Sequence, residues 1–240
     1  MPGTSGIGFA AAEAFVKECA TVFISGRDRD RGARAQAYLR TIAPGGCRAA
    51  PRPATFAAAD VRNLTAMKAL VKAAGDFQIA INNAGVGGYG VRRLVDVDEA
   101  LLADALFAHD PIGINLRGLV ISMHAELNHW EARCGAAKTP EACSRVMVVT
   151  GSISGQVSSP RTAVYAATKA AANSLCRSGE RERVCMRAHV CVGPDVCKCT
   201  HLCQRVCASL CACRVCLHPC CKNLCASMPS SGNRCLAFLA

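Results

Sequence analysis

Residues 77–85 read Phe-Gln-Ile-Ala-Ile-Asn-Asn-Ala-Gly, a short apolar run that ends in a polar turn containing glycine. Similar runs stand at residues 21–25, 55–59 and 145–150, and each also leads into a turn that begins with Gly or Asp. Helix-like segments alternate with them, at residues 6–17, 63–74, 99–127 and 164–177. This alternation predicts a parallel sheet whose strands are joined by helices. Open sheets of this kind bind ligands beside the carboxyl ends of their strands.

Single residues set some of the predicted boundaries. Asn63 is a candidate N-cap and Gly75 a stop for the helix between them. Pro111 divides the helical segment 99–127 into two pieces, because the residue before a proline disfavours helical geometry. Residues 128–144 are predicted to be a surface insertion between a helix and a strand.

Composition restricts the class of protein. The 240 residues suffice for one domain with a buried core, and 51% of them are apolar. The formal net charge is +11, but the basic residues are scattered and only 5% of residues are aromatic, so we expect no nucleic-acid partner. No apolar run is long enough to span a bilayer, and the first residues do not resemble a signal peptide. We therefore expect no membrane partner and a cytoplasmic location, with an organellar one left open.

The cysteines divide the chain into two parts. Five of the 18 precede residue 184 and thirteen follow it. We therefore treat residues 1–183 as one α/β unit and residues 184–240 as an irregular Cys-rich tail. Residues 184–192 have the pattern of neither a helix nor a strand, and all nine can be encoded by codons that alternate purine and pyrimidine. This favours the hypothesis that the tail is not evolved protein sequence but the translation of a retained intron.

A metal-binding tail is the functional alternative. Its cysteines are dense enough to bind zinc or copper(I). Only Cys213 and Cys216 have the C-x-x-C spacing of a zinc knuckle, however, and no second knuckle completes the site. We therefore predict no metal site.

A glycine-rich turn begins the α/β unit. Residues 3–8 read Gly-Thr-Ser-Gly-Ile-Gly and lead directly into a predicted helix. Glycines let a backbone approach a pyrophosphate, and a helix N-terminus offers N–H groups and a favourable dipole. Twenty residues after Gly6, at the end of the next strand, Gly26 is followed by Arg27. Arginine there favours the 2′-phosphate of NADP, which makes NAD the less favoured cofactor; the alternative is that Arg27 is a solvated loop residue.

A second group of residues has the chemistry of proton transfer. Tyr165 and Lys169 stand four residues apart in a predicted helix and so share one face of it. A cation beside a phenol favours the phenolate, which suits a tyrosine that exchanges a proton with a carbonyl oxygen. Ser152 lies thirteen residues before Tyr165, just past a predicted strand. Asn115 lies upstream in a helical segment, and a buried structural asparagine is its alternative interpretation.

In order and spacing, these motifs resemble those of the short-chain dehydrogenase/reductase family. The family reads Thr-Gly-x-x-x-Gly-x-Gly at the first turn; Gly6 and Gly8 match its last two glycines, whereas Pro2 stands at the first. Residues 82–85 resemble the Asn-Asn-Ala-Gly stretch that stabilises the central sheet beside the cofactor. The resemblance implies a Rossmann-like, doubly wound parallel sheet, here lacking the first strand that precedes the glycine turn. It also places Cys19 where the first helix ends in a left-handed glycine.

The resemblance also implies roles for the site residues. Tyr165 would be the acid/base, Lys169 its electrostatic partner and the anchor of the nicotinamide ribose, and Ser152 the group that polarises the carbonyl. Asn115 would support a water in the proton relay. Asp60 and Val61 resemble the pair that contacts the adenine ring. The implied cofactor-binding set is Thr4, Ser5, Gly6, Ile7, Gly8, Arg27, Asp60, Val61, Asn83, Ala84, Gly85, Tyr165 and Lys169.

The implied function is hydride transfer between NADP(H) and a small-molecule carbonyl or secondary alcohol. The alternative is a catalytically inactive truncated or mis-spliced product with an incidental thiol-rich tail, for which metal binding is left open. Neither the substrate nor the direction of reaction is specified, because the family selects its substrate with the part of the chain that corresponds to the tail. Homo-oligomerisation is left open for the same reason.

Overall fold

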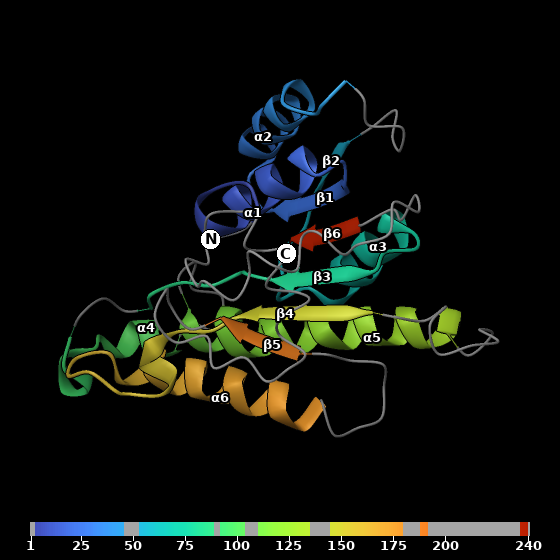
Figure 1. Ribbon diagram of the computed structural model, residues 1–240. Helices are drawn as coiled ribbons and strands as arrows, with labels where there is room; N and C mark the ends of the chain where they lie inside the picture. The colour runs from blue at the N-terminus through green and yellow to red at the C-terminus, as the bar shows by residue number, and fades with distance from the viewer. Residues whose placement is uncertain are drawn as a thin grey trace, which may run out of the picture.

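The computed structural model describes residues 3–45, 53–88, 92–103, 110–134, 145–179, 188–191 and 236–239. These residues form a parallel sheet of order β2-β1-β6-β3-β4-β5 with helices packed against it (Figure 1). The strands are β1 (Thr21–Gly26), β2 (Ala54–Ala58), β3 (Ile79–Asn82), β4 (Val146–Thr150), β5 (Ala188–Cys191) and β6 (Leu236–Leu239). The α-helices are α1 (Gly6–Lys17), α2 (Arg29–Thr41), α3 (Leu64–Ala74), α4 (Glu99–Ala103), α5 (Leu119–Cys134) and α6 (Ala163–Gly179). Short 3₁₀ turns span Leu94–Asp96 and Ile153–Gly155, and a π-helical segment, η2 (Ile112–Gly118), leads into α5.

The predicted limits of α3 are confirmed. The side chain of Asn63 accepts a hydrogen bond of 2.9 Å from the backbone N–H of Ala66, which satisfies one donor of the first helical turn. Gly75 ends the helix with a φ of +73°. Cys19, just after α1, also has the left-handed backbone expected there, with a φ of +63°. That conformation costs a residue with a Cβ about 1 kcal/mol or more.

Two of the strands, β5 and β6, come from residues 184–240, the segment interpreted from the sequence as an irregular Cys-rich tail. β5 pairs with β4 at one edge of the sheet, and β6 lies between β1 and β3. In this register Phe238 stands opposite Phe23 of β1 and Ala80 of β3. The rest of residues 184–240 lies outside the described residues. The absence of the family's first strand stays a prediction.

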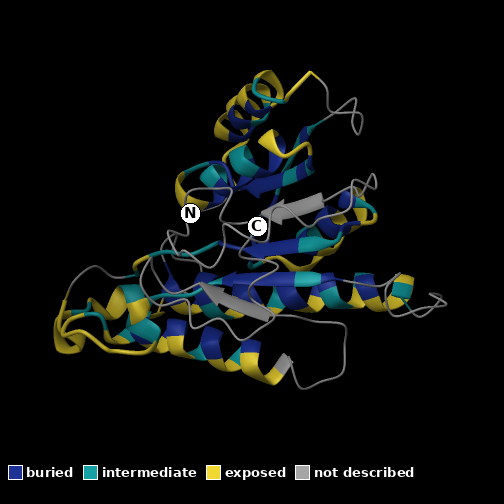
Figure 2. Ribbon diagram, in the orientation of Figure 1, coloured by how far each residue is buried: buried dark blue, intermediate teal, exposed yellow. Residues whose placement is uncertain are grey.

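Buried side chains form one cluster on each face of the sheet (Figure 2). Ala80 and Met147 belong to one cluster and their neighbours Ile81 and Val148 to the other, as expected because successive side chains of a strand point to opposite faces. Residues of α1 and α2 contribute to the cluster of Ile81, and residues of α3, α5 and α6 to that of Ala80. The helices are thus divided between the two faces, as the doubly wound prediction requires.

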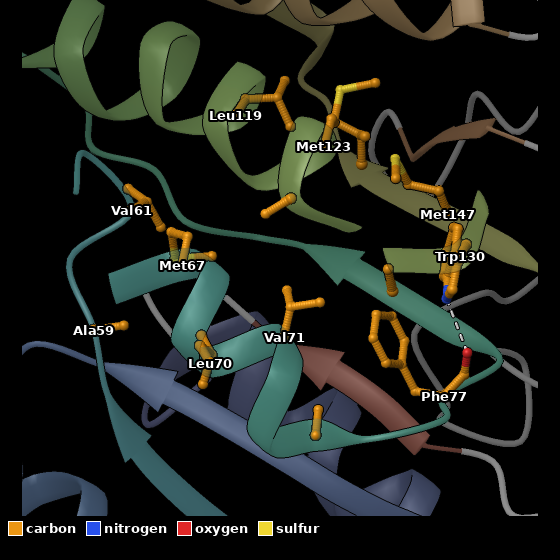
Figure 3. Close-up of a cluster of buried hydrophobic side chains, with 14 of the residues drawn as sticks. Ala59, Val61, Met67, Leu70, Val71, Phe77, Leu119, Met123, Trp130 and Met147 are labelled. Carbon is orange, nitrogen blue, oxygen red and sulfur yellow. Dashed lines mark hydrogen bonds between the residues drawn. The ribbon is translucent and has the colours of Figure 1, made fainter. Parts of the chain in front are cut away.

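The predicted surface insertion over residues 128–144 is wrong for its first part, because α5 continues to Cys134. The cause is Trp130, which is 2% exposed and packs in the core cluster shown in Figure 3. Its indole N–H donates a hydrogen bond of 2.9 Å to the carbonyl of Phe77, which ties the helix to the segment before β3 (Figure 3). Residues 135–144 lie outside the described residues.

Glu126 of α5 is a fully buried carboxyl group in the same region. Its Oε2 accepts a hydrogen bond of 2.8 Å from the side-chain amide of Asn82, at the end of β3. Its Oε1 has no hydrogen-bond partner within the described part of the chain. Burial raises the pKa of Glu126 to about 8, against a smaller lowering by the Asn82 hydrogen bond. The side chain is therefore a neutral carboxylic acid at pH 7.

Candidate active site

The predicted site residues follow the carboxyl ends of parallel strands. β1, β3 and β4 point the same way in the sheet, so the turns after them lie along one edge (Figure 1). Arg27 follows β1, residues 83–85 follow β3, and Ser152 follows β4 by two residues. The sequence prediction that ligand-binding turns gather at this edge agrees with the topology.

The glycine turn packs closely against the turn after β3. Gly6 has a φ of +59°, a left-handed conformation that favours glycine. A Cβ added at Gly8 would lie 2.7 Å from Nδ2 of Asn83 and 3.2 Å from the Cα of Gly3. A larger residue at Gly8 would therefore displace one of the two turns. This contact explains why a glycine is needed where α1 starts.

The start of α1 has the features of an anion site. Ser5 stands at the N-cap, yet no side chain caps the first turn, so its N–H groups are available to a ligand. The side chain of Thr4 is buried, and its hydroxyl has no hydrogen-bond partner among the described residues. Ile7 is 61% exposed although it is apolar. Free backbone N–H groups at a helix N-terminus suit an anion such as a phosphate, and the roles of Thr4, Ser5 and Ile7 toward a cofactor stay predictions.

Asp60 is held by an arginine that the sequence analysis did not select. Arg62 donates two side-chain hydrogen bonds to its carboxylate, of 3.1 and 2.8 Å, and a third through its backbone N–H. Burial acts to raise the pKa of Asp60, but Arg62, with a smaller contribution from the charge of Arg27, lowers it below its usual value. The Asp-x-Arg spacing was the available signal. Arg27 itself is exposed.

Val61 is a packing residue in this structure. It is 9% exposed, and a Cβ added at Gly118 would lie 2.6 Å from its Cγ2. The valine thus fixes the position of η2 relative to the loop after β2. Its contact with an adenine ring stays a prediction.

Thr150 joins β3, β4 and α6 at the site. Its hydroxyl donates a hydrogen bond of 3.0 Å to Oδ1 of Asn83, and its carbonyl accepts one of 2.7 Å from Nζ of Lys169. Thr150 is absent from the predicted site residues, because a threonine at the end of a strand carries no distinctive sequence signal. It positions two of the predicted site residues at once.

Tyr165 and Lys169 share one face of α6, as their spacing predicted. Nζ of Lys169 lies 5.9 Å from the centroid of the Tyr165 ring. The lysine is 6% exposed, and burial lowers its pKa below the usual value. Of the three donors of its ammonium group, one is used by the Thr150 carbonyl, which leaves two for a ligand.

The side chain of Asn115 is engaged with the protein itself. Its Oδ1 accepts a hydrogen bond of 2.8 Å from the N–H of Val86, and its Nδ2 donates to the carbonyl of Val86 at 2.9 Å and to the hydroxyl of Thr168 at 3.2 Å. These contacts correspond to the structural interpretation of Asn115. It lies in the π-helical segment η2, a feature often found at functional sites. Its support of a relay water stays a prediction.

Ser152 starts the 3₁₀ turn after β4 and is half-buried. Its hydroxyl accepts a hydrogen bond of 3.2 Å from the backbone N–H of Ser154, which fixes the side chain near the start of the turn. The turn packs on α6, since a Cβ added at Gly155 would lie 2.7 Å from the backbone carbon of Lys169. Ser152 is thus held close to the helix that carries Tyr165.

One cavity of about 320 Å³ joins the glycine turn to the tyrosine helix. Its wall contains Gly6, Ile7, Asn83, Gly85, Val86, Gly87, Thr150, Gly151, Tyr165 and Lys169. The predicted residues that do not line this cavity are Thr4, Ser5, Gly8, Arg27, Asp60, Val61, Ala84, Asn115 and Ser152. A separate cavity of about 10 Å³, room for one water, lies behind it between Asn115 and Lys169.

Comparison with known proteins identifies the family. The family model described as short chain dehydrogenase matches residues 2–205. The chain belongs to the short-chain dehydrogenase family. An oxidoreductase of Sarocladium schorii is 30% identical over 177 residues, which cover 73% of this chain and 61% of that protein. A 3β-hydroxysteroid dehydrogenase of Mediterraneibacter gnavus is 30% identical over 181 residues, which cover 73% of this chain and 56% of that protein. The short-chain dehydrogenase described here therefore spans about three fifths of the length of these relatives.

Solved structures agree on the fold. An alcohol dehydrogenase from Thermococcus sibiricus, complexed with 5-hydroxy-NADP, superposes with a TM-score of 0.63 at 21% identity, covering 81% of this chain and 74% of that one. A 3-ketoacyl-(acyl-carrier-protein) reductase from Brucella melitensis, complexed with NADH, superposes with a TM-score of 0.64 at 24% identity. The match covers 80% of this chain and 73% of that one. These likenesses extend over most of the chain and show the same fold.

The described residues contain neither a membrane-spanning helix nor a metal-binding cluster. No helix there is long and apolar enough to cross a membrane. No group of three or more His, Cys, Asp or Glu side chains in the same ranges is arranged to hold a metal ion.

Proposed function

We propose that this short-chain dehydrogenase transfers hydride between NADP(H) and a carbonyl or secondary-alcohol substrate. The observation that carries the proposal is the 320 Å³ cavity, because its wall combines the glycine turn with Tyr165 and Lys169. The dinucleotide supplies or accepts the hydride when it is bound there. The first turn of α1, with Thr4, would hold the phosphates, and Lys169 would hold the nicotinamide ribose with its two remaining donors.

The proton is handled by the protein. In the reducing direction the phenol of Tyr165 donates a proton to the carbonyl oxygen, and in the oxidising direction the phenolate accepts it. Lys169 lies on the same helix face, with its Nζ 5.9 Å from the centroid of the Tyr165 ring, and would place its positive charge near the reacting oxygen. Ser152 would donate a hydrogen bond to the same substrate oxygen. The one-water cavity between Asn115 and Lys169 offers a place for a water that restores the proton.

The preference for NADP rests on charge. Arg27 is exposed directly after β1, at the sheet edge where the adenosine ribose would lie, and its charge reaches Asp60 in the neighbouring turn. A guanidinium there would bind a 2′-phosphate and leave an unsubstituted ribose without a partner.

A nucleotide titration tests the cofactor part of the proposal. NADPH and NADH would be titrated into the full chain by nicotinamide fluorescence. We expect Arg27→Gln to weaken the binding of NADPH about tenfold and the binding of NADH less than twofold. The reason is that only NADPH loses a charge-assisted contact. Arg177→Gln, at the exposed end of α6, is the matched control and should leave both unchanged. Equal affinities for the two nucleotides in the unmodified chain would contradict the preference.

Two glycine variants test the location of the nucleotide. Gly8→Ala places a methyl group 2.7 Å from Asn83 and should abolish nucleotide binding. Gly45→Ala is the control, because nothing lies within 4 Å of a Cβ there. Turnover is tested separately with Tyr165→Phe, which should lower kcat by at least about 100-fold and keep NADPH affinity. Absence of NADPH binding by the unmodified chain would favour the inactive product instead.

A further inference from the structure

A second hollow adjoins Tyr165, and its wall shares Gly87 and Tyr165 with the wall of the large cavity. It measures about 20 Å³, and Tyr165 belongs to its wall as well as to that of the large cavity, whereas none of the described residues of α1 does. The wall also contains Arg92 and Arg161, with the apolar side chains of Leu94 and Val164 beside them. Tyr165 thus borders two cavities. The wall of the larger one includes residues of the glycine turn, and the wall of the smaller one includes two arginines.

Neither arginine is neutralised by the described part of the chain. Arg92 and Arg161 form no ion pair with any acidic side chain there, although Arg93, next in sequence, binds Asp96 through two hydrogen bonds of 2.7 Å. The local acidic partner is therefore used by Arg93, which does not line the hollow. Two guanidinium groups beside one hollow leave their donors to solvent or to an anion.

The backbone holds the two arginines together. The N–H of Arg92 donates a hydrogen bond of 3.1 Å to the carbonyl of Arg161, joining the loop after β3 to the loop before α6. Arg161 has a φ of +66°, a left-handed conformation that glycine would adopt more readily. A residue other than glycine is uncommon in this conformation, so surrounding contacts must hold the backbone of Arg161 in place.

We propose that Arg92 and Arg161 bind a carboxylate of the substrate, so that the chain acts on oxo acids or hydroxy acids rather than on neutral carbonyl compounds. Arginine presents a planar fork that matches a carboxylate. The carboxylate would lie against the two guanidinium groups beside the hollow, and Leu94 and Val164 would contact the carbon chain that leads to the reacting carbonyl at Tyr165. This inference rests on the proposed function for the identity of the reacting group.

The test compares acids with their esters. Ligand-observed NMR titrations of the full chain, with and without NADPH, would use 3-oxobutanoate, 4-oxopentanoate and 5-oxohexanoate and the methyl ester of each. The esters keep the carbonyl and the carbon chain but lack the charge. We expect at least one acid to bind about tenfold or more tightly than its ester, with the difference shrinking as salt is raised.

Two variants locate the effect, a double variant of the hollow and a control. Arg92→Gln with Arg161→Gly should remove the preference for the acid; glycine suits the backbone at 161, so the fold should be retained. Arg177→Gln, an exposed arginine outside the hollow, should keep the preference. Equal binding of acid and ester, no binding of any acid, or a preference that survives the double variant would overturn the proposal. Because the acid preference and nucleotide binding are separate measurements, failure of one is distinguishable from failure of the other.

Discussion

Replacing Glu126 by glutamine should change how stability depends on pH. The buried carboxyl has a pKa of about 8 in the folded chain, against 4.5 as its ordinary value. Between these two values the folded state keeps a proton that the unfolded state has released. Each pH unit in this window therefore lowers the free energy of unfolding by about 1.4 kcal/mol. The destabilisation is absent below pH 4.5, reaches about 3 kcal/mol at pH 7, and stops growing above pH 8.

The glutamine amide cannot ionise, yet its oxygen still accepts a hydrogen bond from Asn82. We therefore expect the unfolding free energy of Glu126→Gln, relative to the unmodified chain, to rise by about 3 kcal/mol between pH 4.5 and pH 7. Urea unfolding at several pH values measures this directly, with the single Trp130 as fluorescence reporter. Only the slope against pH is compared, so a constant offset from the new amide does not matter.

The matched control is Glu131→Gln, an exposed residue on the same helix. The unfolding free energy of this variant should change with pH in the same way as that of the unmodified chain. If the unfolding free energy of Glu126→Gln also changed in this way between pH 5 and pH 8, Glu126 would not be a neutral buried acid and the reasoning would fail.

Three further substitutions test local contacts by urea unfolding. Asn63→Ala removes the N-cap of α3 and should cost about 1 kcal/mol, most of which Asn63→Ser should restore. Gly118→Ala places a methyl group against Val61 and should cost about 2 kcal/mol by overpacking; combining it with Val61→Ala should recover part of this loss, and no recovery would contradict the contact. Asn115→Ala leaves the N–H and carbonyl of Val86 without partners and should cost about 2 kcal/mol, whereas an unchanged stability would show that water replaces the side chain.

Much of the fold follows from local sequence. The apolar runs before Gly26, Asp60 and Gly151 are short and end in residues that break strands, so their positions agree with β1, β2 and β4 to within one residue. The caps of α3 are equally local. The end of α5 was missed because it depends on Trp130 packing under Phe77, a contact between residues more than fifty positions apart.

In the candidate site, too, local features could be predicted from the sequence and contacts between distant residues could not. The spacing of Tyr165 and Lys169 predicts a shared helix face, which the structure confirms. Lys169 also donates a hydrogen bond to the carbonyl of Thr150. This contact depends on how α6 lies over β4, and the spacing of residues in the sequence does not specify that arrangement. Arg62 was missed for a related reason, because a single arginine after an aspartate is usually solvated.

The place of β6 in the sheet has a consequence for biosynthesis. β1 and β3 each pair with residues 236–239, more than 150 positions further along the chain. Until those residues leave the ribosome, the two halves of the sheet have no strand between them, and each presents an unpaired edge. Contacts of such long sequence separation form slowly. The nascent chain should therefore need protection by chaperones until residues 236–239 have emerged, and a message that ends before residue 236 would release two half-sheets prone to aggregate.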